Sequence, residues 1–145
     1  MKIDFGAVVE GYHADMTRTL AFGTLASEMR KMYDVVREAQ QAGVDAVRAG
    51  ATGTQVDTAA RSVIEAAGYG DRFVHGTGHG VGLEIHEAPW LGRAKEDPLP
   101  AGAVVTVEPG IYLPGLGGVR IEDMVEVAAD GGRVIGTSTR DLIEL

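Results

Sequence analysis

The sequence contains no cysteine, and its 13 lysine and arginine residues are outnumbered by 21 aspartate and glutamate residues. Without cysteine, the chain can form no disulfide, no thiol nucleophile and no thiolate zinc site. The formal net charge of −8 argues against a nucleic-acid partner, which needs clustered basic residues. No apolar run reaches the roughly 18 residues of a membrane span, and the N-terminus lacks the features of a signal peptide. We therefore expect a cytoplasmic protein with no nucleic-acid or membrane partner.

The rest of the composition is that of a folded domain. The chain has 145 residues, and a chain of about this size buries roughly two thirds of its unfolded surface. With 45% hydrophobic residues it differs from a disordered acidic tail. Glycine is frequent, with 21 residues that gather mainly at 76–82 and 115–118. Because neither a linker nor an internal repeat is evident, residues 1–145 read as one unit.

The order of apolar patterns predicts strands, then two helices, then strands, which is typical of an α+β fold. Two β-type runs at residues 3–9 and 12–22 flank a short turn and predict a hairpin. Residues 93–102 are polar, carry two prolines and predict a surface loop. The other expected strands are residues 82–86, 104–108, 119–127 and either 134–135 or 142–145.

Two helices are expected in the middle of the chain. Apolar residues at helical spacing follow Ser27 for about five turns and end near Gly50. The second helix begins with a capping box that we predict from Thr54 and Asp57. Its apolar stripe ends before Gly68, which occupies the position of a C-terminal cap.

Four carboxylates stand where a strand should be apolar: Asp4, Asp15, Glu108 and Glu122. A carboxylate buried in a core is costly unless it is paired or bound to a cation. Any one of them is accounted for by the solvent face of an edge strand. Four such residues on separate strands favour a metal site instead. Oxygen-rich sites suit hard or borderline divalent ions, and a histidine shifts the preference toward Mn, Fe, Co or Zn.

Histidine supplies candidate nitrogen ligands in a glycine-rich segment. His75, His79 and His86 lie within twelve residues, and the alternative is a solvated loop with incidental histidines. We interpret His13, the fourth histidine, as structural or exposed. The HEAP sequence at 86–89 is not the H-E-x-x-H zinc motif, because the second histidine is absent and proline breaks a helix.

Other catalytic motifs are absent from the sequence. The glycine cluster does not match G-x-G-x-x-G, because Val81 and Leu83 occupy positions that require glycine. No G-x4-G-K-[ST] phosphate loop occurs, so a nucleotide site is weakly supported. No serine lies in a G-x-S-x-G motif, which argues against a serine hydrolase.

Four segments, in order, resemble the pita-bread metallopeptidases, which include Xaa-Pro aminopeptidases, prolidases and methionine aminopeptidases. The segments are IDFGAVVEGYHADMTRT, HGTGHGVGLEIHEAP, VEPGIY and VRIED, and they extend from Asp4 to Asp123. The compact spacing of VEPGIY and GGVRIED is more similar to the Xaa-Pro peptidases and prolidases than to methionine aminopeptidases. The resemblance implies a pita-bread fold and hydrolysis of an Xaa-Pro bond in a proline-containing peptide or dipeptide.

The resemblance also implies a cofactor of two divalent metal ions, with manganese preferred over cobalt, zinc or iron. Asp15 and Glu122 would bridge the two ions, and the other ligands would each bind one ion. The implied ligand set is Asp4, Asp15, His79, Glu108 and Glu122. Four carboxylates balance the charge of two divalent cations, which agrees with this reading.

The implied reaction is attack of a metal-bridging hydroxide on the scissile carbonyl. By resemblance, Glu108 shuttles the proton to the leaving nitrogen, His86 donates to the tetrahedral intermediate and His75 lines the substrate pocket. Arg120 resembles an arginine of the family that pairs with a metal-binding aspartate and with a tyrosine, here Tyr112.

The family's catalytic domain is larger than 145 residues. The chain therefore resembles the C-terminal part of one pita-bread domain, incomplete at its N-terminus and without an upstream substrate-binding histidine. A catalytically impaired fragment or a binding module is the alternative function; a methionine aminopeptidase or a creatinase-like hydrolase is less favoured. The strand that carries Asp4 would have a free edge, which invites association, including a homo-oligomer.

Overall fold

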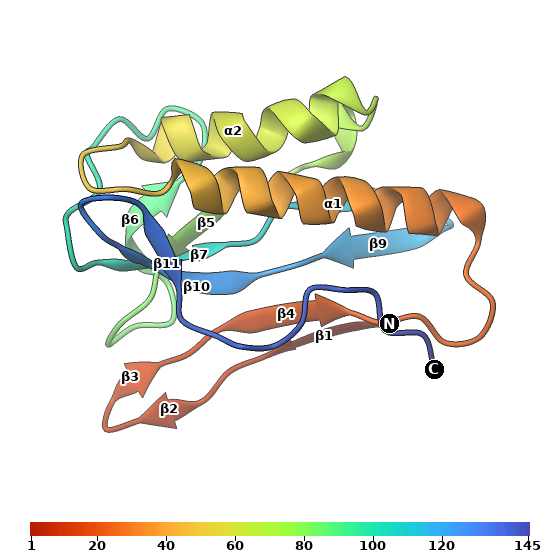
Figure 1. Ribbon diagram of the computed structural model, residues 1–145, viewed down its shortest axis with the longest axis horizontal. Helices are drawn as coiled ribbons and strands as arrows, with labels where there is room; N and C mark the ends of the chain where they lie inside the picture. The colour runs from red at the N-terminus through yellow and green to blue at the C-terminus, as the bar shows by residue number, and fades with distance from the viewer.

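The computed structural model describes residues 1–145 and places two helices side by side over one face of the strands (Figure 1). Helix α1 spans Ser27–Ala46, helix α2 spans Gly53–Ala66, and a single 3-10 turn spans Gly70–Arg72. The strands are β1 Lys2–Phe5, β2 Val8–Val9, β3 Tyr12–His13, β4 Met16–Thr19, β5 Gly78–Gly80, β6 Glu87–Leu91, β7 Val104–Val107, β8 Gly110–Leu113, β9 Gly117–Arg120, β10 Asp123–Val127 and β11 Gly132–Val134.

The strands form one antiparallel sheet of five and three antiparallel pairs. The five-stranded sheet has the order β11-β10-β7-β5-β6, and the pairs are β1-β4, β2-β3 and β8-β9. In Figure 1 the β1–β4 hairpin lies on the side of the strands away from the helices. The predicted α+β class is confirmed, and the helices and the hairpin lie on opposite sides of the strands. No helix is both long and apolar enough to cross a bilayer.

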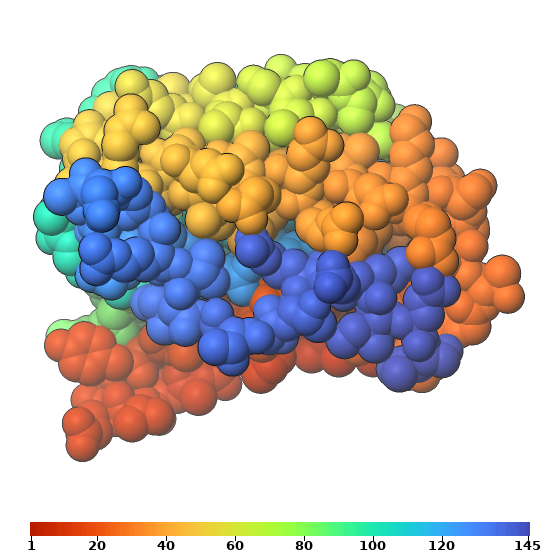
Figure 2. All heavy atoms as spheres, viewed as in Figure 1, coloured from red at the N-terminus to blue at the C-terminus, as the bar shows by residue number.

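The predicted hairpin is present, and its outer strand is exposed. β1 pairs with β4 so that Asp4 lies opposite Thr17, and every residue of β1 is solvent-exposed. Large apolar side chains nearby are also exposed, including Val9 at 69% and Tyr12 at 64%. In Figure 2 this segment forms the red projection at the lower edge of the molecule. Exposure of this strand agrees with the expected free edge, and the homo-oligomer stays a prediction.

The two predicted helices are confirmed, but the predicted capping box is wrong. Thr52, two residues earlier than expected, accepts a hydrogen bond from the backbone N–H of Gln55 at 3.2 Å. The Gln55 side chain accepts in return from the backbone N–H of Thr52 at 3.0 Å. Asp57 cannot cap the helix because it is buried in an ion pair with Arg61. Beyond α2, Gly68 has a φ of +87°, which suits the predicted cap position.

The predicted strand at residues 82–86 is wrong: this segment bends, and strands lie on either side of it. The backbone N–H of Gly82 donates to the Glu84 carbonyl, which closes a tight turn. β5 instead forms where its backbone passes very close to its neighbours. A Cβ at Gly78 would lie 1.9 Å from the Thr106 carbonyl oxygen, so only glycine fits there.

The predicted strand at 119–127 divides into β9 and β10 at Glu122. The Glu122 backbone N–H donates to the Thr17 carbonyl in the hairpin rather than within the sheet. β8, which pairs with β9, was not expected from the sequence. At the C-terminal end, β11 matches the prediction near residue 134, and Glu144 forms an isolated bridge with Ala21. The loop at 93–102 carries no strand, as predicted.

Two clusters of apolar side chains form the core between the helices and the strands. One joins the two helices to β8 and β9 and includes Met32, Val36, Ile64 and Ile111. The other lies under the end of α1 and the start of α2 and consists of Val44, Val47, Val56, Leu91, Leu99, Val105, Val107, Val125 and Val127. These clusters anchor the helix-covered face, so the opposite face of the strands is left to carry polar residues.

Ile64 is fully buried in the first cluster, so its truncation should create a cavity. We expect Ile64→Ala to lower the free energy of unfolding by about 2–5 kcal/mol. Urea denaturation followed by circular dichroism measures this change. Val74 is 75% exposed, so Val74→Ala is the control and should change the free energy by less than about 0.5 kcal/mol. Equal effects of the two substitutions would contradict the described core.

Candidate metal centre

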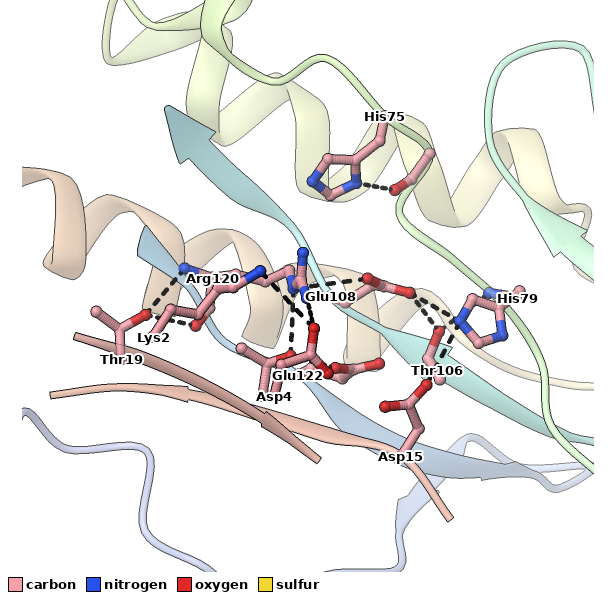
Figure 3. A network of polar contacts seen from close by, with 12 residues as sticks. Lys2, Asp4, Asp15, Thr19, His75, His79, Thr106, Glu108, Arg120 and Glu122 are labelled. Atoms are coloured by element: carbon pink, nitrogen blue, oxygen red, sulfur yellow. Dashed lines mark hydrogen bonds and ion pairs between the residues drawn. The ribbon is translucent and has the colours of Figure 1, made fainter. Parts of the chain in front are cut away.

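A cavity of about 550 Å³ opens between the β1–β4 hairpin and the five-stranded sheet. All five residues of the predicted ligand set line it, together with His86 and Arg120. Five separate segments of the chain supply the five predicted ligands: β1, the residue before β4, β5, the residue after β7 and the break between β9 and β10. Figure 3 shows them converging from these elements. The structure thus brings together the residues that the sequence singled out.

The donor atoms fall into overlapping groups, each compact enough to surround a cation. Three sets of three side chains each offer atoms that lie within 4.8 Å of one another. The sets are Asp4, Asp15 and Glu122; His79, Glu108 and Glu122; and Asp15, His79 and His86. Asp15, His79 and Glu122 each belong to two sets. The donors are carboxylate oxygens and imidazole nitrogens, which is the chemistry that divalent Mn, Fe, Co and Zn accept, so these residues fit such ions.

Crowding of carboxylates in a buried space dominates the electrostatics of the cavity. Glu122 is 1% exposed, and burial, followed by the nearby charges of Glu108 and Asp15, raises its pKa to about 8. Burial and the charges of Asp4 and Glu108 likewise raise the pKa of Asp15. A divalent cation would relieve this repulsion, because it favours the ionised form of each carboxylate around it.

His79 is held so that one ring nitrogen faces the carboxylates. Its Nδ1 lies 3.0 Å from the Gly80 carbonyl oxygen, to which it donates. Its Nε2 is left 3.1 Å from Glu108 and 3.8 Å from Asp15. Burial favours the neutral ring, but the bonds to Glu108 and Gly80 outweigh it and raise the pKa of His79. A backbone carbonyl that fixes the tautomer in this way is common behind metal-binding histidines.

Arg120 lies beside the carboxylates and makes the two contacts that the sequence predicted. Its guanidinium bonds to the Asp4 carboxylate and, through Nη1, to the Tyr112 hydroxyl at 3.4 Å. Tyr112 in turn lies 2.8 Å from Nε2 of His75. His75 is therefore not among the clustered donors but is connected to them through Tyr112 and Arg120. Burial lowers the pKa of His75 and raises that of Tyr112, so both are neutral near pH 7.

Two histidines occupy the rim of the cavity. His86 is exposed, and its ring centroid lies 4.3 Å from that of His79, so it reaches the same space as the ligand set. His13, interpreted from sequence as structural or exposed, also lines the cavity and lies 3.4 Å from the Gly82 carbonyl oxygen. Thr17 and Thr106 contact the candidate ligands and were not singled out. Thr17 shares one strand face with Asp15 and Thr19, because residues two apart in a strand point to the same side. This shared face was the sequence signal that could have identified Thr17 as a neighbour of the site.

Comparisons with known proteins agree with this fold. Residues 1–129 match the model of metallopeptidase family M24. The chain belongs to this family, and it has the family's pita-bread fold. Divalent metal ions are therefore the expected cofactor of the class, and the cavity holds the residues that fit them.

Individual relatives are considerably longer than this chain. An Xaa-Pro dipeptidase of Pyrococcus furiosus is 45% identical over 97% of the chain and 40% of the relative. Among solved structures, an Xaa-Pro dipeptidase from Bacillus anthracis is 49% identical with a TM-score of 0.98 and an X-Pro aminopeptidase from Thermotoga maritima is 42% identical with a TM-score of 0.96. Each match covers 99% of this chain and 41% of the solved chain. The chain thus spans about 40% of the length of the relatives it matches and corresponds to their C-terminal portion.

Buried Glu122 makes the stability of the metal-free protein depend on pH. In the unfolded chain this side chain ionises near its ordinary pKa of 4.5, whereas in the folded protein its pKa is about 8. Between these values the folded state retains a proton that the unfolded state releases. Raising the pH through this window therefore lowers the free energy of unfolding, by at most about 1.4 kcal/mol per pH unit.

Urea denaturation in the presence of a chelator, at about pH 5 and about pH 7.5, measures this effect. Glu122→Gln should flatten the pH dependence, while Glu38→Gln, on an exposed position of α1, should leave it unchanged. The pKa values of Asp15 and His79 are also raised, so these groups lower the free energy of unfolding with rising pH in the wild type and in Glu122→Gln alike. The difference between the pH dependences of these two proteins is therefore due to Glu122. If the free energy of unfolding of Glu122→Gln depended on pH as strongly as that of the wild type, the raised pKa of buried Glu122 would be contradicted.

Proposed function

We propose that the chain carries the metal-binding and catalytic residues of an exopeptidase that hydrolyses the Xaa-Pro bond of a proline-containing peptide or dipeptide. The observation that carries this proposal is the convergence of four carboxylates and His79 on one cavity in a member of family M24. Relatives named Xaa-Pro dipeptidase and X-Pro aminopeptidase support the choice of substrate class.

The proposed cofactor is a pair of divalent ions, with manganese preferred. Asp15 and Glu122 would be shared between the ions, because each belongs to two of the three donor groups and has two carboxylate oxygens. His79 also belongs to two groups, but its Nδ1 donates to the Gly80 carbonyl, so it has one nitrogen left for a cation. The full proposed ligand set is Asp4, Asp15, His79, Glu108 and Glu122. Bound ions would supply Lewis-acid polarisation of the scissile carbonyl and would acidify the attacking water.

Glu108 would act as the proton shuttle, and its charge state supports this role. Burial raises its pKa, but hydrogen bonds from His79 and Thr106 and the charge of Arg120 outweigh burial and lower the pKa below its ordinary value. The carboxylate is therefore ionised near neutral pH and can accept a proton from water. It would then return this proton to the leaving nitrogen of proline.

The histidines and Tyr112 would contact the substrate around this centre. His86, exposed at the cavity rim, would donate a hydrogen bond to the oxygen that becomes negatively charged. Nδ1 of His75 lies 2.7 Å from the Gly76 carbonyl, which leaves Nε2 to accept from the Tyr112 hydroxyl. His75 and Tyr112 would form the wall of the pocket on the leaving-group side. Arg120 would connect this wall to the ligand set, because it bonds to both the Tyr112 hydroxyl and the Asp4 carboxylate.

A binding module without catalysis is the second candidate function. The intact donor set argues against loss of metal binding, so this module would still take up divalent ions. The expected cytoplasmic location and the absence of nucleic-acid and membrane partners stay predictions from composition.

Hydrolysis of Ala-Pro and of Ala-Pro-Ala in the presence of Mn²⁺ or Co²⁺ tests the first candidate. We expect proline or the Pro-Ala dipeptide to be released, because the cavity holds both a metal-binding set and a general base. Glu108→Gln should lower the rate by about 100- to 10,000-fold, the contribution of a positioned proton-transfer group. Cleavage of Ala-Pro alone identifies a dipeptidase, and cleavage of the tripeptide identifies an aminopeptidase.

Glu38→Gln is the control for this assay, because Glu38 lies on the exposed face of α1. Activity that survives both Glu108→Gln and a chelator would disprove the metallopeptidase proposal. A chain that binds Mn²⁺ but releases no product from either peptide would favour the binding module.

A further inference from the structure

Two fully buried threonines contact the candidate ligands through their hydroxyl groups. Thr17 in β4 and Thr106 in β7 both have 0% exposure. Each hydroxyl makes two hydrogen bonds, one with a nitrogen donor and one with a carboxylate of the ligand set. The two residues lie on different sheets, so the same arrangement arises twice in the cavity wall.

Thr17 connects Arg120 to Glu122. Its Oγ1 accepts a hydrogen bond from Nε of Arg120 at 3.2 Å and donates to Oε2 of Glu122 at 2.6 Å. Arg18 anchors the backbone on which this pair depends, because its Nη1 donates to the carbonyls of both Thr17 and Glu122. Asp123 in turn holds the Arg18 guanidinium at 2.6 Å in a buried ion pair.

Thr106 connects the backbone of His79 to Glu108. Its Oγ1 accepts from the backbone N–H of His79 at 3.0 Å and donates to Oε1 of Glu108 at 2.9 Å. Figure 3 shows this hydroxyl between the two ligand side chains. Because the His79 N–H bonds to a side chain here, the position of one candidate ligand is tied to the orientation of another.

A hydroxyl group has one proton, so a hydroxyl that accepts from a fixed N–H must direct its proton elsewhere. In both threonines the proton points at a glutamate oxygen. We propose that Thr17 and Thr106 are positioning residues that fix the rotation of the Glu122 and Glu108 carboxylates for cation binding. This inference rests on the proposed metal-dependent function and assigns the two hydroxyls a task beyond packing.

Packing alone does not require a hydroxyl at these positions. β7 reads Val-Val-Thr-Val, and valine has nearly the same shape as threonine, so valine would fill the same space. A valine would remove the hydroxyl bond to each glutamate, so that Glu122 would lose its hydrogen bond from Thr17 and Glu108 would keep only its bond from Nε2 of His79. Groups that orient metal ligands typically contribute a 10- to 100-fold factor in metal affinity.

Calorimetric titration of the wild-type chain with Mn²⁺ tests the proposal. We expect Thr17→Val and Thr106→Val each to raise the Kd for Mn²⁺ by about 10- to 100-fold. Thr17→Ser and Thr106→Ser retain the hydroxyl and should restore most of the affinity. Circular dichroism and thermal unfolding of the metal-free proteins report the fold separately from the cation.

Thr19 provides a matched control on the same strand. It is 5% exposed, and its hydroxyl also accepts from an N–H and donates to an oxygen, but both groups belong to the Arg120 backbone. Thr19→Val should therefore change thermal stability without changing the Kd for Mn²⁺. This control separates loss of a buried hydroxyl from loss of carboxylate orientation.

The outcomes distinguish this inference from the proposed function. Valine variants that fold and bind Mn²⁺ as the wild type does would overturn the positioning role and leave the metal site intact. A valine variant that is unfolded without metal would assign the hydroxyl to the fold and would also overturn it. A wild-type chain that binds no Mn²⁺ would overturn both the positioning role and the proposed metal site.

Discussion

Repulsion among carboxylates that share one partly buried cavity is the constraint on which the rest of the structure depends. Glu122, Glu108, Asp15 and Asp4 meet in one cavity, and burial together with the charges of Glu108 and Asp15 raises the pKa of Glu122 to about 8. Such a cluster costs free energy in folding unless hydrogen bonds and cations offset it. The fold accommodates this cost by placing its apolar clusters elsewhere, between the helices and the strands.

Hydrogen bonds divide the task of holding these carboxylates among several elements. Arg120 holds Asp4, while two threonine hydroxyls hold the glutamates and the Gly80 carbonyl holds His79. No buried polar side-chain atom lacks a partner, so the site is ordered by the protein itself. A preorganised set of donors loses little freedom when a cation binds, which favours tight and geometrically selective binding.

Much of the fold was predictable because periodicity identifies amphipathic helices and interrupted strands. The candidate ligands could be identified for a related reason. A carboxylate such as Glu122 interrupts an apolar run, and burying it is costly unless it is paired or bound to a cation. The β5 and β6 boundaries were not predictable, because glycines such as Gly78 carry no side-chain pattern. The bond between Thr17 and Glu122 spans 105 residues in sequence, so only the folded register brings the two together. The capping box failed because Asp57, a good capping residue, is used in a buried ion pair.

The β1–β4 hairpin has a consequence for the speed at which a cation could enter or leave. Asp4 lies on β1, whose backbone pairs with β4 alone and whose residues are all exposed. His79, by contrast, lies on an inner strand of the five-stranded sheet. Local opening of a thin edge element costs far less than opening of a packed sheet. A bound cation would therefore lose its Asp4 ligand by local opening more readily than its His79 ligand, and its release would begin on the Asp4 side.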